Sequence, residues 1–188
     1  MKHPLKITFN APVTLTFVAL CFVATLISTL TGGTAGKLLF MTWHSSLASP
    51  LTYVRFFTHV LGHSGFAHFL GNAAYLLLLG PMLEEKHGAG KLIQVILITA
   101  LVTGIVNYIL FPRTALCGAS GVVFAFILLT SFTNFKNGEI PLTFLLVALI
   151  YLGGQVVEMV TVRDNVSNLS HIIGGLVGAG LGYSLNRK

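Results

Sequence analysis

The chemistry that this sequence could perform centres on a serine and a histidine that lie far apart in the chain. Ser120 stands in the motif Gly118-Ala119-Ser120-Gly121, where a short polar break ends and an apolar run begins, so we expect it in the first turn of a membrane-embedded helix. His171 interrupts a second apolar, glycine-rich run. A serine hydroxyl becomes a nucleophile when a neighbouring base, usually a histidine, takes its proton. The two residues are therefore a candidate nucleophile and base if the two runs touch.

Glycines beside both residues favour that contact. Gly174 and Gly178 follow His171 by three and seven residues and have the Gly-xxx-Gly spacing that lets another backbone approach closely. Gly121 offers a matching flat surface next to Ser120. The alternatives are packing or capping for the serine, and for the histidine a buried group bonded to a carbonyl. Ionisable groups inside membrane spans are expensive, however, and indicate function by default.

A catalytic triad would add a carboxylate that orients the imidazole. Of the five acids, only two are expected near the same side of the membrane as Ser120, so we favour a dyad over a triad. The five are Glu84, Glu85, Glu139, Glu158 and Asp164.

Cleavage of an amide also needs donors that stabilise the developing oxyanion. His68 and Asn72 are four residues apart and share a helical face. The backbone N–H of Ser120, at a helix N-terminus, is a further candidate donor.

Three histidines within ten residues, His59, His63 and His68, raise the possibility of a zinc site. The His-Glu-xx-His motif is absent, and Glu84 and Glu85 fall at the opposite end of the second span, so the case for a metal hydrolase is weak. We predict no metal and no cofactor, and we expect His63 to brace the loop or the site through hydrogen bonds.

The two cysteines, Cys21 and Cys117, are expected to be free thiols, because one lies in an apolar run and the other in the serine loop. Cys117 lacks the helix-start position of Ser120, and its small size is reason enough for its presence. We interpret it as structural.

Composition identifies the setting of this chemistry. The 188 residues are 54% hydrophobic and only 9% charged, which indicates an all-α, polytopic membrane protein with a single domain over residues 1–188. The net charge of +6 comes from scattered basic residues, which form no patch suited to nucleic acid. We expect membrane lipid and membrane proteins as its surroundings and partners.

Six spans are expected, with a long connection over residues 31–66 after the first. That connection is aromatic and interrupted by glycines, so it should lie in the membrane interface, anchored by Arg55. A cleaved signal peptide is the alternative for the first run, which is long enough to be a retained span. The spans are approximately 11–30, 67–83, 92–111, 118–135, 142–159 and 169–185.

The positive-inside rule predicts cytoplasmic termini and a site toward the outer side. This orientation puts seven cations inside and four outside, and it places Ser120 and His171 at similar depth. The inner set is Lys2, Lys6, Lys86, Lys91, Lys136, Arg187 and Lys188; the outer set is Lys37, Arg55, Arg113 and Arg163.

Taken together, these motifs resemble those of the rhomboid intramembrane serine proteases. Gly118-Ala119-Ser120-Gly121 is similar to the family's Gly-x-Ser-Gly nucleophile motif, and His171 with Gly174 and Gly178 is similar to its last helix. The run His59-xxx-His63-xxxx-His68-xxx-Asn72 resembles the second-helix signature, and Arg55 and Glu84 resemble the loop anchor and the acid that ends that helix.

The resemblance implies a minimal six-helix, bacterial-type bundle in the cell membrane. It implies oxyanion roles for His68 and Asn72, a first loop lying in the outer leaflet, and a gate formed by the fifth helix and residues 153–168. One position departs from the commonest pattern, because Phe124 stands where many members have tyrosine. A ring that can stack on His171 remains there, and only the phenolic hydroxyl is lost.

The expected function is that of a serine endopeptidase cleaving transmembrane or juxtamembrane segments of membrane proteins through Ser120 and His171. The alternatives are a catalytically silent relative that binds membrane helices, and a small transporter with a histidine proton path. The chain keeps both catalytic residues, which weakens the first, and it shows no paired embedded carboxylates or inverted repeats, which weakens the second.

Overall fold

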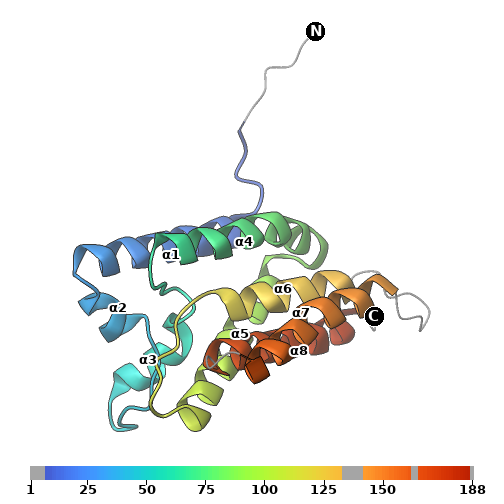
Figure 1. Ribbon diagram of the computed structural model, residues 1–188. Helices are drawn as coiled ribbons and strands as arrows, with labels where there is room; N and C mark the ends of the chain where they lie inside the picture. The colour runs from blue at the N-terminus through green and yellow to red at the C-terminus, as the bar shows by residue number, and fades with distance from the viewer. Residues whose placement is uncertain (1–6, 133–141, 162–164, 187–188) are drawn as a thin grey trace.

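The computed structural model describes residues 7–132, 142–161 and 165–186, which form helices and connecting segments with no strand among them. Six longer helices and two short ones form a bundle (Figure 1). Their bounds are α1 Pro12–Leu30, α2 Thr34–Leu39, α3 Pro50–Thr58, α4 Phe66–His87, α5 Ala89–Leu110, α6 Ser120–Phe132, α7 Leu142–Thr161 and α8 Asn165–Asn186.

Among the described residues, α1, α4 and α5 are long and apolar enough to cross a membrane, and α6 contributes a shorter apolar stretch. At 1.5 Å per residue, the 22 residues of α4 reach about the thickness of the hydrocarbon core. Helices α7 and α8 overlap the last two expected spans. The all-helical membrane architecture is confirmed, and the count of six spans stays a prediction.

Helix α4 continues to His87, one turn beyond residue 83, where the expected span ends, and Glu84 lies in this last turn. The Glu84 carboxylate accepts hydrogen bonds from the Val13 amide at 2.9 Å and from the Thr14 amide and hydroxyl at 3.0 and 2.9 Å. It therefore caps the start of α1, which runs beside α4 (Figure 1). The helix ends at Gly88, whose φ of +83° favours glycine.

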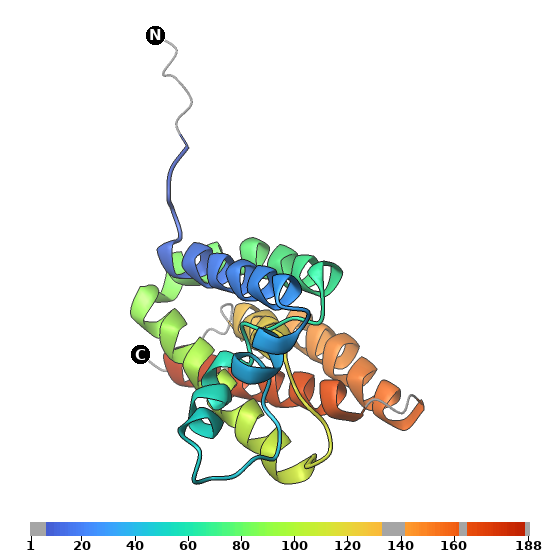
Figure 2. The ribbon, with the colours of Figure 1, turned by 90° about the vertical axis from the view of Figure 1, so that its left-hand side faces the viewer.

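The central helix is α6, with the other long helices arranged around it (Figure 2). Every residue of α6 from Gly121 to Leu129 is buried, as expected for a helix that is apolar on all sides. Ser120 is its first residue, so the candidate nucleophile begins the most enclosed element of the bundle.

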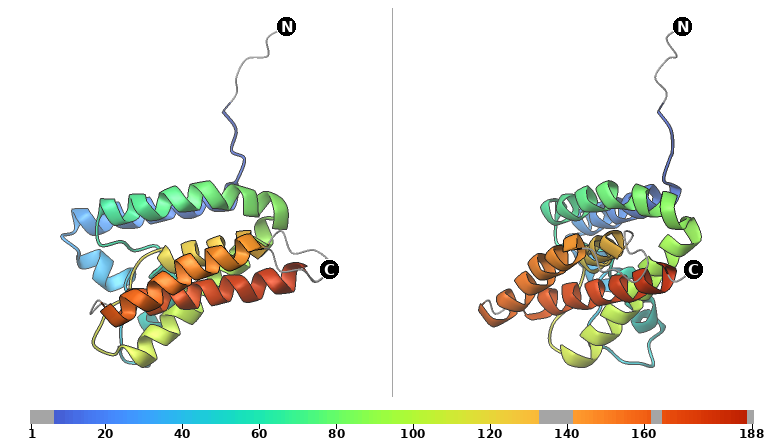
Figure 3. Two further views of the ribbon diagram at one scale, coloured as in Figure 1. Left: turned by 45° about the vertical axis from the view of Figure 1, so that its right-hand side comes forward. Right: turned by 90° about the vertical axis from the view of Figure 1, so that its right-hand side faces the viewer.

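Helices α6 and α8 are in backbone contact. A Cβ atom on Gly174 would overlap the Gly121 carbonyl, and one on Gly178 would overlap the Ala125 carbonyl. The expected glycine contact between the serine and histidine helices is thus confirmed. Helix α7 lies across α8 on the outside of the bundle (Figure 3).

Residues 31–65 form the long connection, which contains α2 and α3. Helix α3 buries Thr52, Arg55 and Phe56 and exposes Tyr53 and Phe57, as expected for an amphipathic segment at an interface. The Arg55 Nε donates to the Leu38 carbonyl at 2.8 Å, and its guanidinium lies 3.9 Å from the centre of the Trp43 ring. Arg55 thus joins distant parts of the connection, and its role as the anchor of the loop in the membrane interface stays a prediction.

Several charged residues used for the expected orientation and for the dyad argument lie outside the described residues. They are Lys2, Lys6, Lys136, Glu139, Arg163, Asp164, Arg187 and Lys188, and the same holds for the Glu158 side chain. The orientation therefore stays a prediction.

Candidate active site

The structure brings the candidate nucleophile and base to one cavity. Ser120, at the start of α6, and His171, in the second turn of α8, both line a hollow of about 360 Å³. His68 and Asn72 of α4 line the same hollow. The other lining residues are Ala67, Gly71, Tyr75, Cys117, Val123 and Phe124.

The His171 ring is held by an aromatic partner. Phe124 and His171 stack with ring centroids 4.5 Å apart and an angle of 4° between their planes. Phe124 lies four residues after Ser120, on the same face of α6. The expected stacking by phenylalanine is confirmed, and it keeps the imidazole on the face of α6 that carries the serine.

Hydrogen bonds from Ser64 determine which ring nitrogen of His68 carries the hydrogen. The Ser64 backbone N–H, which can only donate, points to the His68 Nδ1 at 3.5 Å, and the Ser64 hydroxyl is 3.1 Å from the same nitrogen. Since Nδ1 accepts, the hydrogen of the neutral ring is on Nε2. Nε2 faces the serine loop, since a Cβ atom on Gly118 would lie 3.0 Å from it.

Gly118 allows this close approach. Its φ of +131° is one that side chains rarely tolerate, and an added Cβ atom would also lie 2.9 Å from His68 Cε1. A residue with a side chain at this position would therefore push His68 away from the serine.

Asn72 is buried and lies one helical turn after His68 in α4. Its amide nitrogen donates to the His68 carbonyl at 3.2 Å, and this bond uses one of the two amide hydrogens. The side chain is thereby oriented while one N–H remains for a further acceptor.

Two buried histidines hold the segment just before the serine. The His59 carbonyl accepts the Gly118 amide at 2.9 Å, and the His63 Nε2 lies 3.5 Å from the Ala119 amide. The His63 Nδ1 donates to the Leu61 carbonyl at 3.1 Å, which leaves Nε2 as the acceptor. His63 thus contacts the serine loop, and its bracing role stays a prediction.

Both histidines are held in the neutral form. Burial lowers the pKa of His59 to about 4, against an opposing contribution from backbone hydrogen bonds to Arg55 and Phe56. Burial, reinforced by His68, also lowers the pKa of His63 to about 4. A neutral His63 keeps the lone pair that faces the Ala119 amide.

The long connection reaches the serine loop at a second place. Thr42 and Leu116 exchange two backbone hydrogen bonds of 3.0 and 2.9 Å, which form an isolated antiparallel bridge. The Asn107 amide donates to the Thr42 and Thr114 carbonyls. The loop that presents Ser120 is thus fixed by residues from α5 and from the segment between α2 and α3.

The two cysteines are free, as expected. Cys117 is half-buried and lines the cavity, and burial raises the pKa of its thiol. Within the described part of the chain, no three His, Cys, Asp or Glu side chains gather closely enough to hold a metal ion.

Sequence reasoning did not identify three contributors to this site. Ser64 orients His68, Thr103 of α5 lies 3.2 Å from the His59 Nε2, and Thr42 pairs with the serine loop. Of the three, only Ser64 could have been found from the sequence, because it lies four residues before the candidate histidine His68. The other two act across distant parts of the chain.

Comparison with known proteins identifies the family of this chain. The Rhomboid domain family model matches residues 50–188, a range that contains all of the candidate catalytic and oxyanion residues. The chain belongs to the rhomboid family and is a membrane protein.

Two relatives illustrate the similarity. Rhomboid-related protein 1 of Caenorhabditis elegans is 30% identical over 138 residues, which cover 69% of this chain and 39% of that protein. Rhomboid protease GlpG of Enterobacter sp. (strain 638) is 33% identical over 114 residues, which cover 61% of this chain and 41% of that protein. The chain spans about two fifths of the length of these curated relatives.

Proposed function

We propose that this protein is an intramembrane serine endopeptidase that cleaves transmembrane or juxtamembrane segments of other membrane proteins. The observation that carries the proposal is the shared cavity of Ser120 and His171, with the His171 ring stacked on Phe124 and with His68 and Asn72 on the facing wall. The protease named among the relatives supports the same reaction class.

In the proposed reaction, His171 takes the proton from the Ser120 hydroxyl as the oxygen attacks the scissile carbonyl. The tetrahedral intermediate collapses when His171 gives the proton to the leaving amine. Water, deprotonated by the same imidazole, then hydrolyses the acyl-enzyme. A dyad suffices for these transfers, and no cofactor takes part.

The oxyanion is assigned to three donors around the cavity. The His68 Nε2–H follows from the tautomer that Ser64 fixes, and Asn72 offers an amide N–H. The third donor is the Ser120 N–H, one of the first amides of α6, which lack intrahelical partners. Donors fixed before the reaction stabilise the transition state without reorganisation.

The substrate proposed is a membrane helix that can unwind locally. A helical backbone conceals its carbonyls in hydrogen bonds, so helix-destabilising residues near the cut should favour cleavage, with small side chains at the cut itself. We place the cavity toward the outer side of the cell membrane and both termini in the cytoplasm, in a six-span domain whose fifth helix and residues 153–168 act as a gate. Residues 162–164 of that segment lie outside the described residues.

The experiment uses the full chain in detergent or liposomes with a transmembrane model substrate and a fluorophosphonate probe. Ser120→Ala and His171→Ala should reduce cleavage to background, since loss of either member of such a pair costs about 10⁶-fold in comparable hydrolases. Ser120→Ala should also abolish probe labelling. Ser131→Ala, on the same helix but hydrogen-bonded to the Ile127 carbonyl, is the matched control and should keep both activities.

Undiminished cleavage in Ser120→Ala would contradict the serine assignment. Cleavage that a chelator removes would favour a metal hydrolase instead. Substrate that co-purifies with the wild-type protein, without cleavage or labelling, would identify a catalytically silent helix binder.

A further inference from the structure

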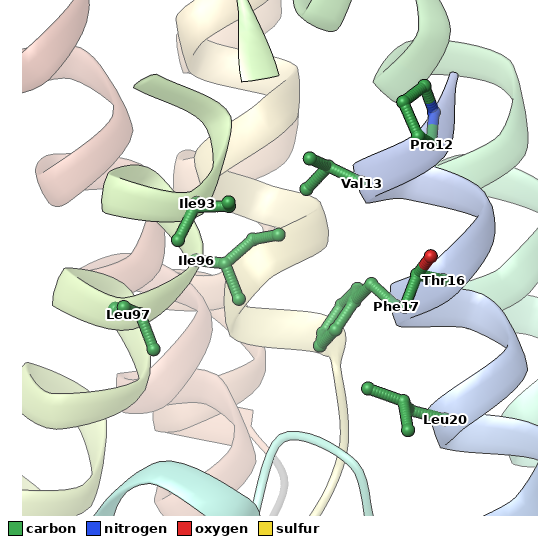
Figure 4. A pocket seen from close by; sticks show the side chains of 8 residues that line it. All are labelled: Pro12, Val13, Thr16, Phe17, Leu20, Ile93, Ile96 and Leu97. Carbon is green, nitrogen blue, oxygen red and sulfur yellow. The ribbon is translucent and has the colours of Figure 1, made fainter. Parts of the chain in front are cut away.

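A second hollow lies between α1 and α5 and shares no lining residue with the candidate active site. It has a volume of about 360 Å³, and Figure 4 shows side chains from both helices facing one another across it. Phe17 and Ile96 are buried at its base, whereas Leu20, Ile93 and Leu97 are between 44% and 49% exposed. The lining consists of Pro12, Val13, Thr16, Phe17, Leu20, Ile93, Ile96 and Leu97.

This α1–α5 groove is confined to part of the membrane thickness. On α1 it extends over the nine residues from Pro12 to Leu20, or about 12 Å of helix. It stops where the connection after α3 packs on α1, with the Cys21 thiol 3.7 Å from the Val60 carbonyl. One leaflet of a hydrocarbon core of about 30 Å is close to this length. A crossing helix would require a groove along the whole of α1, whereas one acyl chain fits a groove of one leaflet.

A further hollow, with two glutamates in its lining, adjoins the other end of the groove. Pro12 lines both, and the second hollow, of about 580 Å³, adds Asn10, Met82 and Glu85 among its lining residues. Glu84 also faces it, but both oxygens of its carboxylate accept bonds from Val13 and Thr14. Glu85 is exposed at the rim, and no lysine or arginine is among the described residues that line this hollow.

An apolar, leaflet-deep groove with an acidic rim matches one kind of ligand. We propose that the α1–α5 groove binds a phospholipid, with one acyl chain between α1 and α5 and an ammonium-bearing headgroup next to Glu85. The acyl chain removes the exposed parts of Leu20, Ile93 and Leu97 from contact with mobile lipid, and the ammonium complements the Glu85 carboxylate. The site is separate from the cavity of Ser120 and does not depend on the proposed protease activity.

Two measurements test the proposal on the full chain. The first needs no substitution: a phosphatidylethanolamine with a photoreactive group midway along one acyl chain is crosslinked in liposomes, and labelled peptides are mapped. We expect labelling concentrated on residues 12–20 and 93–97. Labelling spread evenly over α1, α4 and α5 would overturn the groove assignment.

The second measurement counts lipids that stay bound in native mass spectrometry, with phosphatidylethanolamine and phosphatidylglycerol offered in equal amounts. Wild-type protein should retain one lipid and prefer phosphatidylethanolamine several-fold. Ile93→Trp, which fills the groove, should lose that lipid, whereas Leu78→Trp, an exposed position of α4 outside the groove, should keep it.

Glu85→Gln separates the headgroup from the acyl chain. It should keep one bound lipid but lose the preference for phosphatidylethanolamine. An unchanged preference, or a wild-type preference for phosphatidylglycerol, would refute the headgroup assignment, and equal lipid retention by Ile93→Trp and Leu78→Trp would refute the groove.

Discussion

The polar side chains at the two ends of α4 differ in how far their hydrogen-bonding groups are occupied. At its C-terminal end, the Glu84 carboxylate accepts three hydrogen bonds from the start of α1 and is saturated. At its N-terminal end, His68 and Asn72 each use part of their capacity to fix an orientation, and both line an open cavity. A polar group whose partners are all within the protein stabilises the fold, whereas one that is oriented and still faces a cavity is available for chemistry.

The largest effect expected from this comparison is on catalysis at the N-terminal end. Asn72→Ala should reduce kcat by about 10²- to 10³-fold, the usual loss for one oxyanion donor, with little change in thermal stability. Cleavage rates and unfolding temperatures in the same detergent measure both. If Asn72→Ala lowered the unfolding temperature but left kcat unchanged below that temperature, the role of Asn72 would be structural and not catalytic.

The converse is expected at the C-terminal end. Glu84→Ala leaves two amides and a hydroxyl of α1 without their acceptor and should lower the free energy of unfolding by about 2–4 kcal/mol. Glu85→Ala, at the exposed neighbouring position, is the control and should change it by less than about 0.5 kcal/mol. Equal effects of the two substitutions would argue against the capping role of Glu84.

Acid should weaken the brace formed by the neutral histidines. His59 and His63 have a pKa of about 4 in the fold against 6.5 for an ordinary histidine, so between these values the unfolded chain binds more protons. Stability should therefore fall as the pH is lowered from about 6.5 to about 4, by at most about 1.4 kcal/mol per pH unit for each histidine. Unfolding measured across this range should show a smaller slope for His63→Gln, and an unchanged slope would contradict the assignment.

The smallest effects are expected at the aromatic partner of His171. Phe124→Leu removes the stacked ring, a contact of about 0.5–1.5 kcal/mol, and should lower kcat by up to about tenfold. Phe124→Tyr keeps the ring and should stay within about threefold of wild type. If Phe124→Tyr lowered kcat more than Phe124→Leu, ring stacking on His171 would not be the contribution of Phe124 to catalysis.

Much of the fold could be predicted because the membrane imposes helices on long apolar runs. Helices α1 and α5 begin and end within a few residues of the expected spans. Helix α4 extends four residues past the expected end of its span at residue 83, through the charged residues 84–86 to His87. The bonds of Glu84 to the start of α1 could not be read from the sequence, since Thr14 lies seventy residues away in the chain.

The candidate site was predictable in part for a similar reason. Ser120, His171, His68 and Asn72 stood out because polar residues are rare in apolar runs, and the glycines beside two of them indicated the helix contact. The contacts of the serine loop with the His59 carbonyl, Thr42 and Asn107 were not visible in the same way. Backbone groups and ordinary polar residues of a loop carry no signal of which distant segment they will meet.

The sequence by itself determined the membrane setting, the helical architecture, the residues available for chemistry and the Gly174 face that lets α8 approach α6, because these depend on composition and on local spacing. Only the tertiary structure decided that these residues share one cavity, which His68 tautomer faces it, and that Glu84 caps the start of α1 while Glu85 stays exposed. Those outcomes depend on which groups meet across long stretches of chain, and the hydrogen bonds and packing that fix them exist only once the bundle has formed.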